Sequence, residues 1–373
     1  MREFIDGAEA ISLAAIRAGC NFFAGYPITP ATPILLHMTR DLPRVGGVAI
    51  QAEDEIAAMG MCIGAAMAGS RVMTATSGPG ISLYSENIGL AIMGEVPIVI
   101  VDAQRMGPAT GAATTTAQGD VQFLRWGTSG GYPVIVLSPW SVASCFTLTL
   151  RAFDLAERFR TPVFLATDKE MVLGRTTVPV EDLVEIPVRE RRMASPDGTF
   201  VPYPEDAPLG VPEMAVMGGP HIVRFTTSSH DARGHLTKAP AAVGALNERL
   251  TRKIEDHLEE IEWVLEDLAP NADTLVVSYG TTARASREAV EAARGAGHRV
   301  SHLIVESIWP VPEAAILRAA VGVQQVLVPE LNTGQYRREV ERVMEGQAAV
   351  LGVNRVDGEL ITPLEILEAG GLS

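Results

Sequence analysis

The 373-residue sequence predicts an α/β protein in which a doubly wound parallel sheet is followed by a second, smaller α/β domain. Two observations support this prediction. Runs of apolar, β-branched residues alternate with amphipathic helical patterns, which is typical of a parallel sheet covered by helices on both faces. A stretch at 176–240 lacks any periodicity and separates the two regions.

The first domain is predicted over residues 1–185. It begins with a short apolar strand inside NFFAGYPITPATPILL (21–36), which leads into a turn that its prolines make rigid. Five further strands follow, separated by helical patterns: VGGVAIQ (45–51), RVMTATS (71–77), VPIVIVDAQ (96–104), YPVIVLS (132–138) and TPVFLAT (161–167).

Residues 186–243 are predicted to form an extended linker or an arm that wraps a partner, and the length of this segment favours the arm. The second domain is predicted over 244–373. It opens with a charged helix at 246–268, and the α/β pattern then resumes with strands in TLVVSYGTT (274–282), RVSHLIVES (299–307) and QQVLVPELN (324–332).

Composition excludes several classes of protein. A net charge of −15 without a cluster of Lys and Arg argues against a nucleic-acid partner. The three cysteines lie far apart without a CxxC motif, so we expect reduced, buried thiols rather than disulfides or an iron–sulfur cluster within this chain. The N-terminus has no apolar signal core and no run is apolar enough to cross a membrane, so the expected location is the cytoplasm, without membrane contact.

The first candidate site residue is Glu53, in IQAEDEIAAMGMCIGAAMAG (50–69). It stands where strand 45–51 gives way to a helix rich in small residues, and such a helix packs closely. The alternative is that Glu53, Asp54 and Glu55 only complement the dipole of the helix N-terminus.

A second candidate is the turn Ser77-Gly78-Pro79-Gly80, between a strand and a helix in TATSGPGISLYSENIG (74–89). Glycines let backbone approach a ligand, and a helix start offers free N–H groups. The turn matches neither the phosphate-loop nor the dinucleotide fingerprint.

The third candidate is Arg105, which a buried strand delivers into a loop of small and hydroxylated residues. Its guanidinium fits a carboxylate in two-point fashion, so the sequence indicates either a substrate carboxylate or a structural ion pair.

Thr29, Glu53, the Ser77–Gly80 turn and Arg105 all follow the carboxyl ends of predicted parallel strands, so we expect them to converge on one crevice. Competing chemistry has weaker support. No G-x-S-x-G elbow is present, and the two histidines of SSHDARGHLT (228–237) are more typical of a solvated or interfacial loop than of a metal site, so no metal site is predicted.

These motifs resemble the α subunit of the 2-oxoacid:ferredoxin oxidoreductases, most of all the 2-oxoglutarate type. The resemblance runs in order through GYPITPATPI, QAEDEIAAMGMCIGAAMAG, TATSGPGISL, GEVPIVIVDAQRMGPATG, SSHDARGHLT, ESIWPVP and VPELNTGQ. It implies a pyrimidine-binding domain for thiamine diphosphate and a second domain like the C-terminal domain of transketolase.

The resemblance implies half of an active site that oxidatively decarboxylates 2-oxoglutarate with CoA to succinyl-CoA and carbon dioxide. The β subunit would hold the diphosphate, the magnesium ion and an iron–sulfur cluster, and ferredoxin would accept the electrons. In agreement, this chain has no GDG-containing motif and no cysteine cluster. Whether a separate γ subunit belongs to the complex is left open.

The resemblance also assigns roles to residues. Glu53 would hold the N1′ side of the cofactor's pyrimidine ring in a dry pocket. Arg105 would bind the substrate carboxylate, and Thr29 would place its hydroxyl beside the substrate. The resemblance puts the following residues around the cofactor: Tyr26, Pro27, Ile28, Ser77, Gly78 and Gly80.

Three alternatives remain at this stage. The substrate could instead be pyruvate or a branched-chain 2-oxoacid. The chain could belong to a non-oxidative decarboxylase whose two cofactor domains lie on separate chains, such as a sulfopyruvate or pyruvate-type enzyme. It could also be a non-catalytic assembly subunit, although its retained Thr29, Glu53 and Arg105 argue against that.

Overall fold

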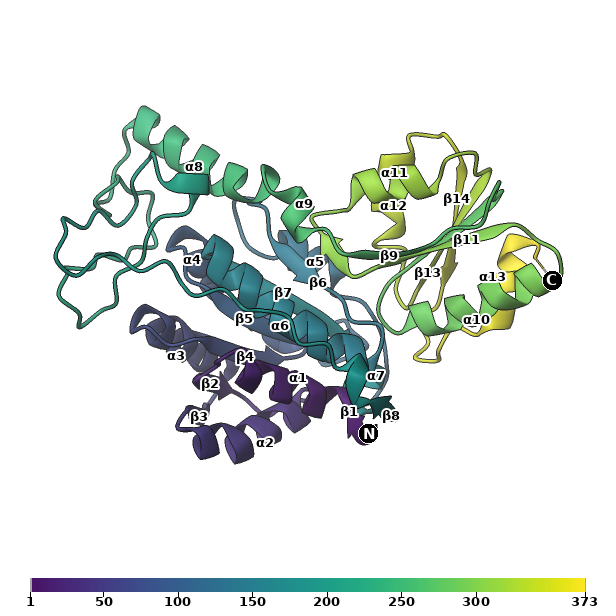
Figure 1. Cartoon of the computed structure of the whole chain (residues 1–373), viewed down its shortest axis with the longest axis horizontal. Coiled ribbons are helices and arrows are strands. Elements are labelled where there is room, and N and C mark those ends of the chain that lie inside the picture. Colours follow the sequence, from purple (N-terminus) through teal and green to yellow (C-terminus); the bar gives the residue numbers. More distant parts are fainter. Residues whose placement is uncertain (1, 373) are drawn as a thin grey trace.

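The computed structural model describes residues 2–372 and contains two α/β units joined by an extended segment and a helix (Figure 1). This agrees with the predicted fold class. The first unit contains β1 (Arg2–Asp6), α1 (Gly7–Arg17), β2 (Phe22–Gly25), α2 (Thr32–Asp41), β3 (Val48–Gln51), α3 (Glu55–Met67), β4 (Val72–Thr76), α4 (Gly78–Met93), β5 (Ile98–Gln104), α5 (Val121–Trp126), β6 (Ile135–Leu137), α6 (Val142–Phe159), β7 (Pro162–Asp168), α7 (Lys169–Leu173) and β8 (Arg175–Pro179).

The remainder of the chain forms the second unit and the connection to it. Its elements are α8 (Pro240–Glu255), α9 (Leu258–Ile261), β9 (Val264–Asp267), β10 (Thr274–Ser278), α10 (Thr282–Gly295), β11 (Val300–Val305), β12 (Ser307–Trp309), α11 (Glu313–Ala319), β13 (Gln325–Glu330), α12 (Arg337–Met344), β14 (Ala349–Asn354) and α13 (Pro363–Gly370).

The sheet of the first unit has seven strands in the order β12-β6-β7-β5-β4-β2-β3, and every neighbouring pair except β12–β6 is parallel. The central strand β5 is buried along its whole length, which its apolar sequence IVIVDAQ requires. Val99 and Val101 face the core beneath α1, α2 and α6. Ile98 and Ile100 face the opposite core, beneath α3 and α4.

The second sheet has the order β14-β13-β10-β11-β9, in which only β9 is antiparallel to its neighbour. A third, two-stranded sheet joins β1 to β8 in antiparallel register, and the sequence pattern did not predict it.

Two predictions about the second domain were wrong in detail. The helix expected at 246–268 begins earlier, at α8, and ends by α9, because 264–267 pairs with β11 as an edge strand. The run RVSHLIVES, predicted as one strand, divides into β11 in the second sheet and β12, which pairs with β6 in the first sheet. Charged residues among the apolar ones at 262–268 suited a helix, and pairing with a distant strand overrode that local pattern.

The segment between β8 and α8 runs as an irregular chain past α6 and loops out before α8 leads back toward the second sheet (Figure 1). Buried ion pairs fasten it to the first unit. Arg191 donates two hydrogen bonds to Glu157 of α6, at 2.7 and 2.9 Å. Ile222 is 89% exposed, so part of the segment remains open to a partner. A partner-wrapping arm at 186–243 stays a prediction.

Helix α8 is anchored through Glu95, a fully buried carboxylate at the end of α4. Arg249 lies 2.7 Å and Lys253 3.0 Å from its oxygens. Burial alone would raise the pKa of Glu95, but Lys253 and Arg249 outweigh burial and hold the pKa at about 2. The carboxylate therefore stays ionised and ties the connecting helix to the first unit.

Two motifs of the second unit connect it to the first. In ESIWPVP, Trp309 belongs to β12 and donates its indole N–H to Val121 O at 3.0 Å. In VPELNTGQ, Asn332 donates to Gln118 O at 2.8 Å and Gln335 donates to Gly119 O at 2.6 Å. The first motif is therefore bonded to the start of α5, and the second to the loop between β5 and α5.

The three cysteines are free and buried, as predicted: Cys20, Cys62 and Cys145. Burial raises the pKa of the Cys62 thiol to about 12, so this group stays protonated and unreactive. Across residues 2–372, the helices are all too short or too polar to cross a membrane.

Candidate functional site

Neighbouring parallel strands in the order β5-β4-β2-β3 end at one edge of the first sheet. A candidate residue follows each strand: Arg105 after β5, Ser77 after β4, Thr29 after β2 and Glu53 after β3. Ligands of open α/β sheets bind at this carboxyl edge.

The turn after β2 holds Thr29 at the surface. Tyr26, Pro27 and Ile28 are half-buried, whereas Thr29 is exposed. The turn closes when Thr32 donates its N–H to Ile28 O at 2.9 Å, and α2 starts at once. The hydroxyl of Thr29 is therefore presented from a rigid support.

Arg105 is 6% exposed and supports this turn from the protein interior. Its Nη1 donates to Thr29 O at 2.6 Å and its Nη2 to Thr110 O at 3.1 Å. Within residues 2–372, no carboxylate lies within ion-pair distance of Arg105, and its buried Nε has no partner. The structural ion pair considered above is therefore not found there, and a buried cation at a strand end without a contacting carboxylate suits an anionic ligand.

The acidic run 53–55 divides into three different environments. Asp54 is the N-cap of α3 and accepts the Ala57 N–H at 2.7 Å. Glu55 is buried in the first turn of the helix. Glu53 is exposed and has neither a hydrogen bond nor an ion pair to the described part of the chain. The helix-charge explanation therefore suits Asp54 and Glu55 but leaves Glu53 without a structural partner.

The turn after β4 is shaped by close packing. A Cβ atom on Gly80 would lie 1.9 Å from Thr76 Oγ1 and 2.8 Å from Glu55 Cγ, so only glycine fits there. Ser77 is the N-cap of α4, yet its side chain makes no capping bond, and its buried Oγ has no hydrogen-bond partner among the described residues. The start of a long helix thus carries an unused hydroxyl beside a glycine turn, which suits a bound ligand.

These groups match the needs of the aminopyrimidine ring of thiamine diphosphate. Such a ring requires a carboxylate, hydrogen-bond partners and a close backbone. Glu53 would supply the carboxylate, and the Ser77–Gly80 turn the backbone and the hydroxyl. Their assignment to the cofactor remains a proposal.

A cavity of about 520 Å³ extends from Arg105 into the junction between the two units. The first unit contributes the start of α4 and the loop after β5, and the second unit contributes 331–335 and Val356. The second unit therefore helps to shape the space next to Arg105.

Sequence reasoning missed a pair of acidic residues beside this cavity. Asp102 lies fully buried near the end of β5, and Asp120 lies at the start of α5. Burial and the neighbouring Asp120 raise the pKa of Asp102 well above its usual range. Burial also raises the pKa of Asp120 to about 6, although a hydrogen bond with Asp102 and, less strongly, the charge of Arg105 lower it. The available signal in the sequence is a carboxylate that directly follows the apolar run IVIV of a predicted buried strand.

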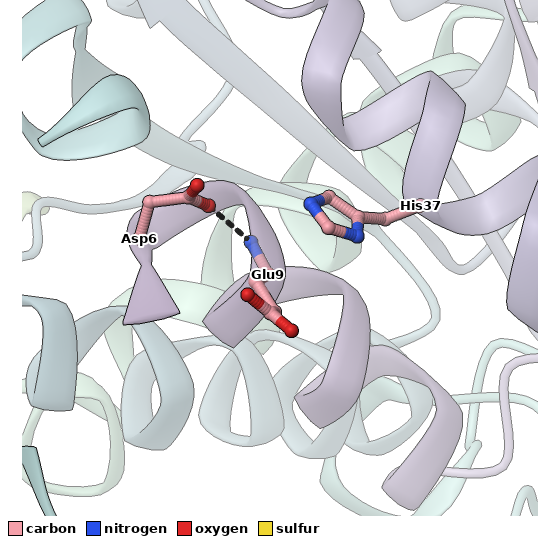
Figure 2. Close-up of side chains that lie close together, drawn as sticks. All are labelled: Asp6, Glu9 and His37. Carbon is pink, nitrogen blue, oxygen red and sulfur yellow. Dashed lines mark hydrogen bonds between the residues drawn. The ribbon is translucent and has the colours of Figure 1, made fainter. Parts of the chain in front are cut away.

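One cluster away from this edge has the side chains of a metal site: Asp6, Glu9 and His37 lie within 4.8 Å of one another (Figure 2). Asp6 caps α1 by accepting the Glu9 N–H at 2.9 Å, and it also lies 3.5 Å from Arg175. His37 Nδ1 lies 2.9 Å from a guanidinium nitrogen of Arg40. Because Asp6 and His37 already contact donors of this chain, the cluster is better described as a helix cap with ion pairs.

The two histidines of SSHDARGHLT lie in different environments. His230 is 2% exposed, stacks on Tyr203 with ring centroids 4.2 Å apart and contacts Ser228 O through Nδ1 at 2.9 Å. His235 is exposed and lies 3.6 Å from Asp231. This loop is a compact surface turn.

The fold just described is a two-unit α/β fold, and its first unit is a thiamine diphosphate-binding domain by its family match. Residues 13–247 match the family model "Pyruvate flavodoxin/ferredoxin oxidoreductase, thiamine diP-bdg", and residues 272–366 match "Pyruvate:ferredoxin oxidoreductase core domain II". The chain belongs to the α subunits of the 2-oxoacid:ferredoxin oxidoreductases.

Two relatives are 2-oxoglutarate synthase subunits KorA. The one from Methanothermobacter thermautotrophicus is 44% identical over 98% of this chain and 96% of its own length. The one from Methanocaldococcus jannaschii is 42% identical over 98% of both. The solved 2-oxoglutarate:ferredoxin oxidoreductase from Magnetococcus marinus, with 2-oxoglutarate, coenzyme A and succinyl-CoA bound, matches with a TM-score of 0.92 and 30% identity. That match covers 99% of this chain and 65% of that chain.

Proposed function

We propose that this chain is the α subunit of a thiamine diphosphate-dependent 2-oxoglutarate:ferredoxin oxidoreductase. The complex would convert 2-oxoglutarate and CoA to succinyl-CoA and carbon dioxide and pass the electrons to ferredoxin. The names of the relatives and of the structural neighbour support 2-oxoglutarate as the substrate.

The observation that carries the proposal is Arg105, which lies beside Thr29 on the same sheet edge as Glu53. Within residues 2–372 neither Arg105 nor Glu53 forms an ion pair. A 2-oxoacid needs a cation for its carboxylate, and the cofactor ring needs a carboxylate. Each group on this edge is therefore matched by one requirement of the reaction.

In this proposal each residue of the chain has a separate task. Glu53 holds a proton shared with the pyrimidine ring, the Ser77–Gly80 turn fixes the ring against backbone, and Arg105 orients the substrate carboxylate. Thiamine diphosphate, when bound, supplies the carbon nucleophile and the electron sink for decarboxylation. Thr29 donates its hydroxyl to the substrate from a turn held by Arg105.

The remaining parts of the site are assigned to a β subunit. That subunit would bind the diphosphate and magnesium and carry at least one iron–sulfur cluster. The exposure of Glu53 and Thr29 supports this division, because a dry pocket requires a partner to cover them.

A surface of small and apolar residues next to Glu53 suits that partner. On α3 it consists of Ile56, Gly60, Met61 and Gly64, and on α4 of Leu83; we call it the α3–α4 face. Ile56 is 51% and Leu83 48% exposed. A Cβ atom on Gly60 or Gly64 would meet nothing within 4 Å in this chain. Exposed apolar patches of this kind mark interfaces.

Gly64→Leu tests the α3–α4 face. The larger side chain should leave the isolated chain folded, since glycine is a poor helix former, yet overpack the interface. We expect the β subunit to bind more weakly by about 1–3 kcal/mol, roughly 5- to 150-fold in Kd. Gly244→Leu on α8 is the matched control, because Gly244 is also exposed and its Cβ would also meet nothing within 4 Å. Wild-type affinity in the Gly64 variant would remove this face from the interface.

The activity itself is tested by viologen reduction without oxygen, using this chain alone and co-purified with the β subunit. The assay contains thiamine diphosphate, magnesium, CoA and a panel of 2-oxoacids. We expect reduction with 2-oxoglutarate only in the complex. Reduction with pyruvate or a branched-chain 2-oxoacid alone would correct the substrate.

The same assay separates the remaining alternatives. Carbon dioxide release without viologen reduction would indicate a non-oxidative decarboxylase, and cluster cysteines in the β subunit would argue against it. A stable complex with no turnover of any 2-oxoacid would indicate a non-catalytic subunit.

A further inference from the structure

Two carboxyl groups lie behind Arg105 at the end of β5. Asp102 is fully buried and lies against Asp120, and within residues 2–372 no N–H or O–H of another residue donates to its carboxyl oxygens. Asp120 borders the cavity next to Arg105, and its buried Oδ2 likewise receives no such donor from the described residues. Two neighbouring carboxyl groups in a low-dielectric interior cannot both ionise readily, so one of them keeps a proton.

The surroundings decide which group ionises. Asp120 faces Arg105 and the start of α4, where a Cβ atom on Gly78 would lie 3.3 Å from Asp120 Oδ2. A guanidinium and a helix N-terminus both favour a carboxylate. Asp102 has no such cation and lies deeper in the strand, so it retains the proton. The pKa of Asp120, at about 6, leaves it ionised at neutral pH.

Other titratable groups lie on this face of the sheet. Asp168 of β7, which pairs with Gln104, accepts the N–H groups of Met171 and Thr281, and burial raises its pKa to about 6. Tyr84 of α4 bonds to Thr74 Oγ1 at 2.8 Å, and burial raises its pKa far above neutrality. Glu55 of α3 packs against Gly80 at the start of α4. Arg105 is the cation that acts on the pKa of Asp120.

The second unit holds Asp120 in place. Gln118 donates to Tyr279 O at 3.4 Å and accepts the Leu331 N–H at 3.3 Å. The Asp120 N–H is itself bonded to Gln104 Oε1 at 3.0 Å. These bonds fix the backbone at Asp120 from both sides, so its carboxyl group is anchored beside the cavity.

We propose that Asp120 is a positioning residue that couples binding of the substrate carboxylate at Arg105 to uptake of one proton from solvent, while Asp102 stays protonated beside it. This inference rests on the proposed role of Arg105. In the free site the ionised Asp120 partly offsets the charge of Arg105 across the shared cavity, at more than ion-pair distance. A substrate carboxylate brings a second negative charge, which raises the pKa of Asp120, and the carboxylate takes up a proton.

The sign of the pH effect follows from this linkage. Below the pKa of free Asp120, at about 6, the residue is already protonated and binding takes up no proton. Above that pH, each bound substrate requires a proton, so affinity weakens as pH rises, by up to tenfold per pH unit. Above the pKa of Asp120 in the bound state, Asp120 is ionised with and without substrate, so Kd no longer changes with pH.

The experiment is isothermal titration calorimetry of 2-oxoglutarate into the complex of this chain with its β subunit. The complex is loaded with 3-deazathiamine diphosphate, which cannot attack a carbonyl. Titrations near neutral pH are made in two buffers that differ in their enthalpy of ionisation. The difference between the two observed binding enthalpies gives the number of protons taken up per bound substrate. We expect the wild type to take up a substantial fraction of a proton and its Kd to rise several-fold per pH unit.

Asp120→Asn and Asp102→Asn form a matched pair of variants. Asp120→Asn should abolish proton uptake and make Kd nearly independent of pH. Asp102→Asn replaces a protonated acid with a neutral isostere, so proton uptake should persist. Tight binding without proton uptake in the wild type, or unchanged uptake in Asp120→Asn, would overturn the inference and leave the proposed function intact. Absence of any 2-oxoacid binding to the wild type would overturn both.

Discussion

Replacement of Glu53 by glutamine is expected to lower turnover about 10²- to 10⁴-fold, the range typical of a lost acid–base group. Glutamine keeps the shape of the side chain but cannot share a proton with the cofactor ring. Glu53 has no partner in the described chain, so the fold should not depend on its charge. Viologen reduction by the purified complex at saturating 2-oxoglutarate measures the effect.

Asp54→Asn is the matched control, since it makes the same carboxyl-to-amide change one residue away. Asn caps a helix as well as Asp, so α3 and the activity should be retained. Turnover in Glu53→Gln like that of the wild type would remove the proposed role of Glu53. Loss of complex formation in that variant would point to an interface role instead.

Replacement of Arg105 by alanine is expected to lower kcat/KM about 10²- to 10³-fold for every 2-oxoacid tested, because all of them share the carboxylate beside the keto group. Loss of one partner from a buried charge pair costs about 2–5 kcal/mol, which brackets this range. Steady-state kinetics over the 2-oxoacid panel measures the change.

The Arg105 side chain also donates to Thr29 O and Thr110 O, so its loss could act through the turn. Arg105→Lys separates the two effects. Lysine restores the positive charge but lacks the planar guanidinium that binds a carboxylate at two points. We therefore expect Arg105→Lys to recover part of the substrate affinity but not the full rate. Wild-type kinetics in Arg105→Ala would make the residue structural.

The candidate edge was predictable because its logic is local. An apolar, β-branched run of four to seven residues flanked by helical patterns indicates a parallel strand, and the residue after such a strand must lie at the carboxyl edge. This reasoning identified Thr29, Glu53, Ser77 and Arg105 without knowledge of the strand order. That these strands are neighbours, β5-β4-β2-β3, is a property of the sheet.

Short edge strands were not predictable in the same way. Both β9 and β12 are only a few residues long, and each is defined by pairing with a strand far away in the sequence. Local periodicity does not contain that information, so 262–268 was read as helix and β12 as the end of β11.

The sequence by itself therefore determined the α/β class, the two units and the strand-end residues, because apolar periodicity and turn chemistry act within a few residues. Only the tertiary structure decided that Arg105 and Glu53 form no ion pair within residues 2–372, that Asp54 caps α3, and that Asp102 lies beside Asp120. The burial of a side chain and its hydrogen-bond partners depend on residues that are distant in the sequence. They are therefore determined only when the sheet and the second unit have assembled.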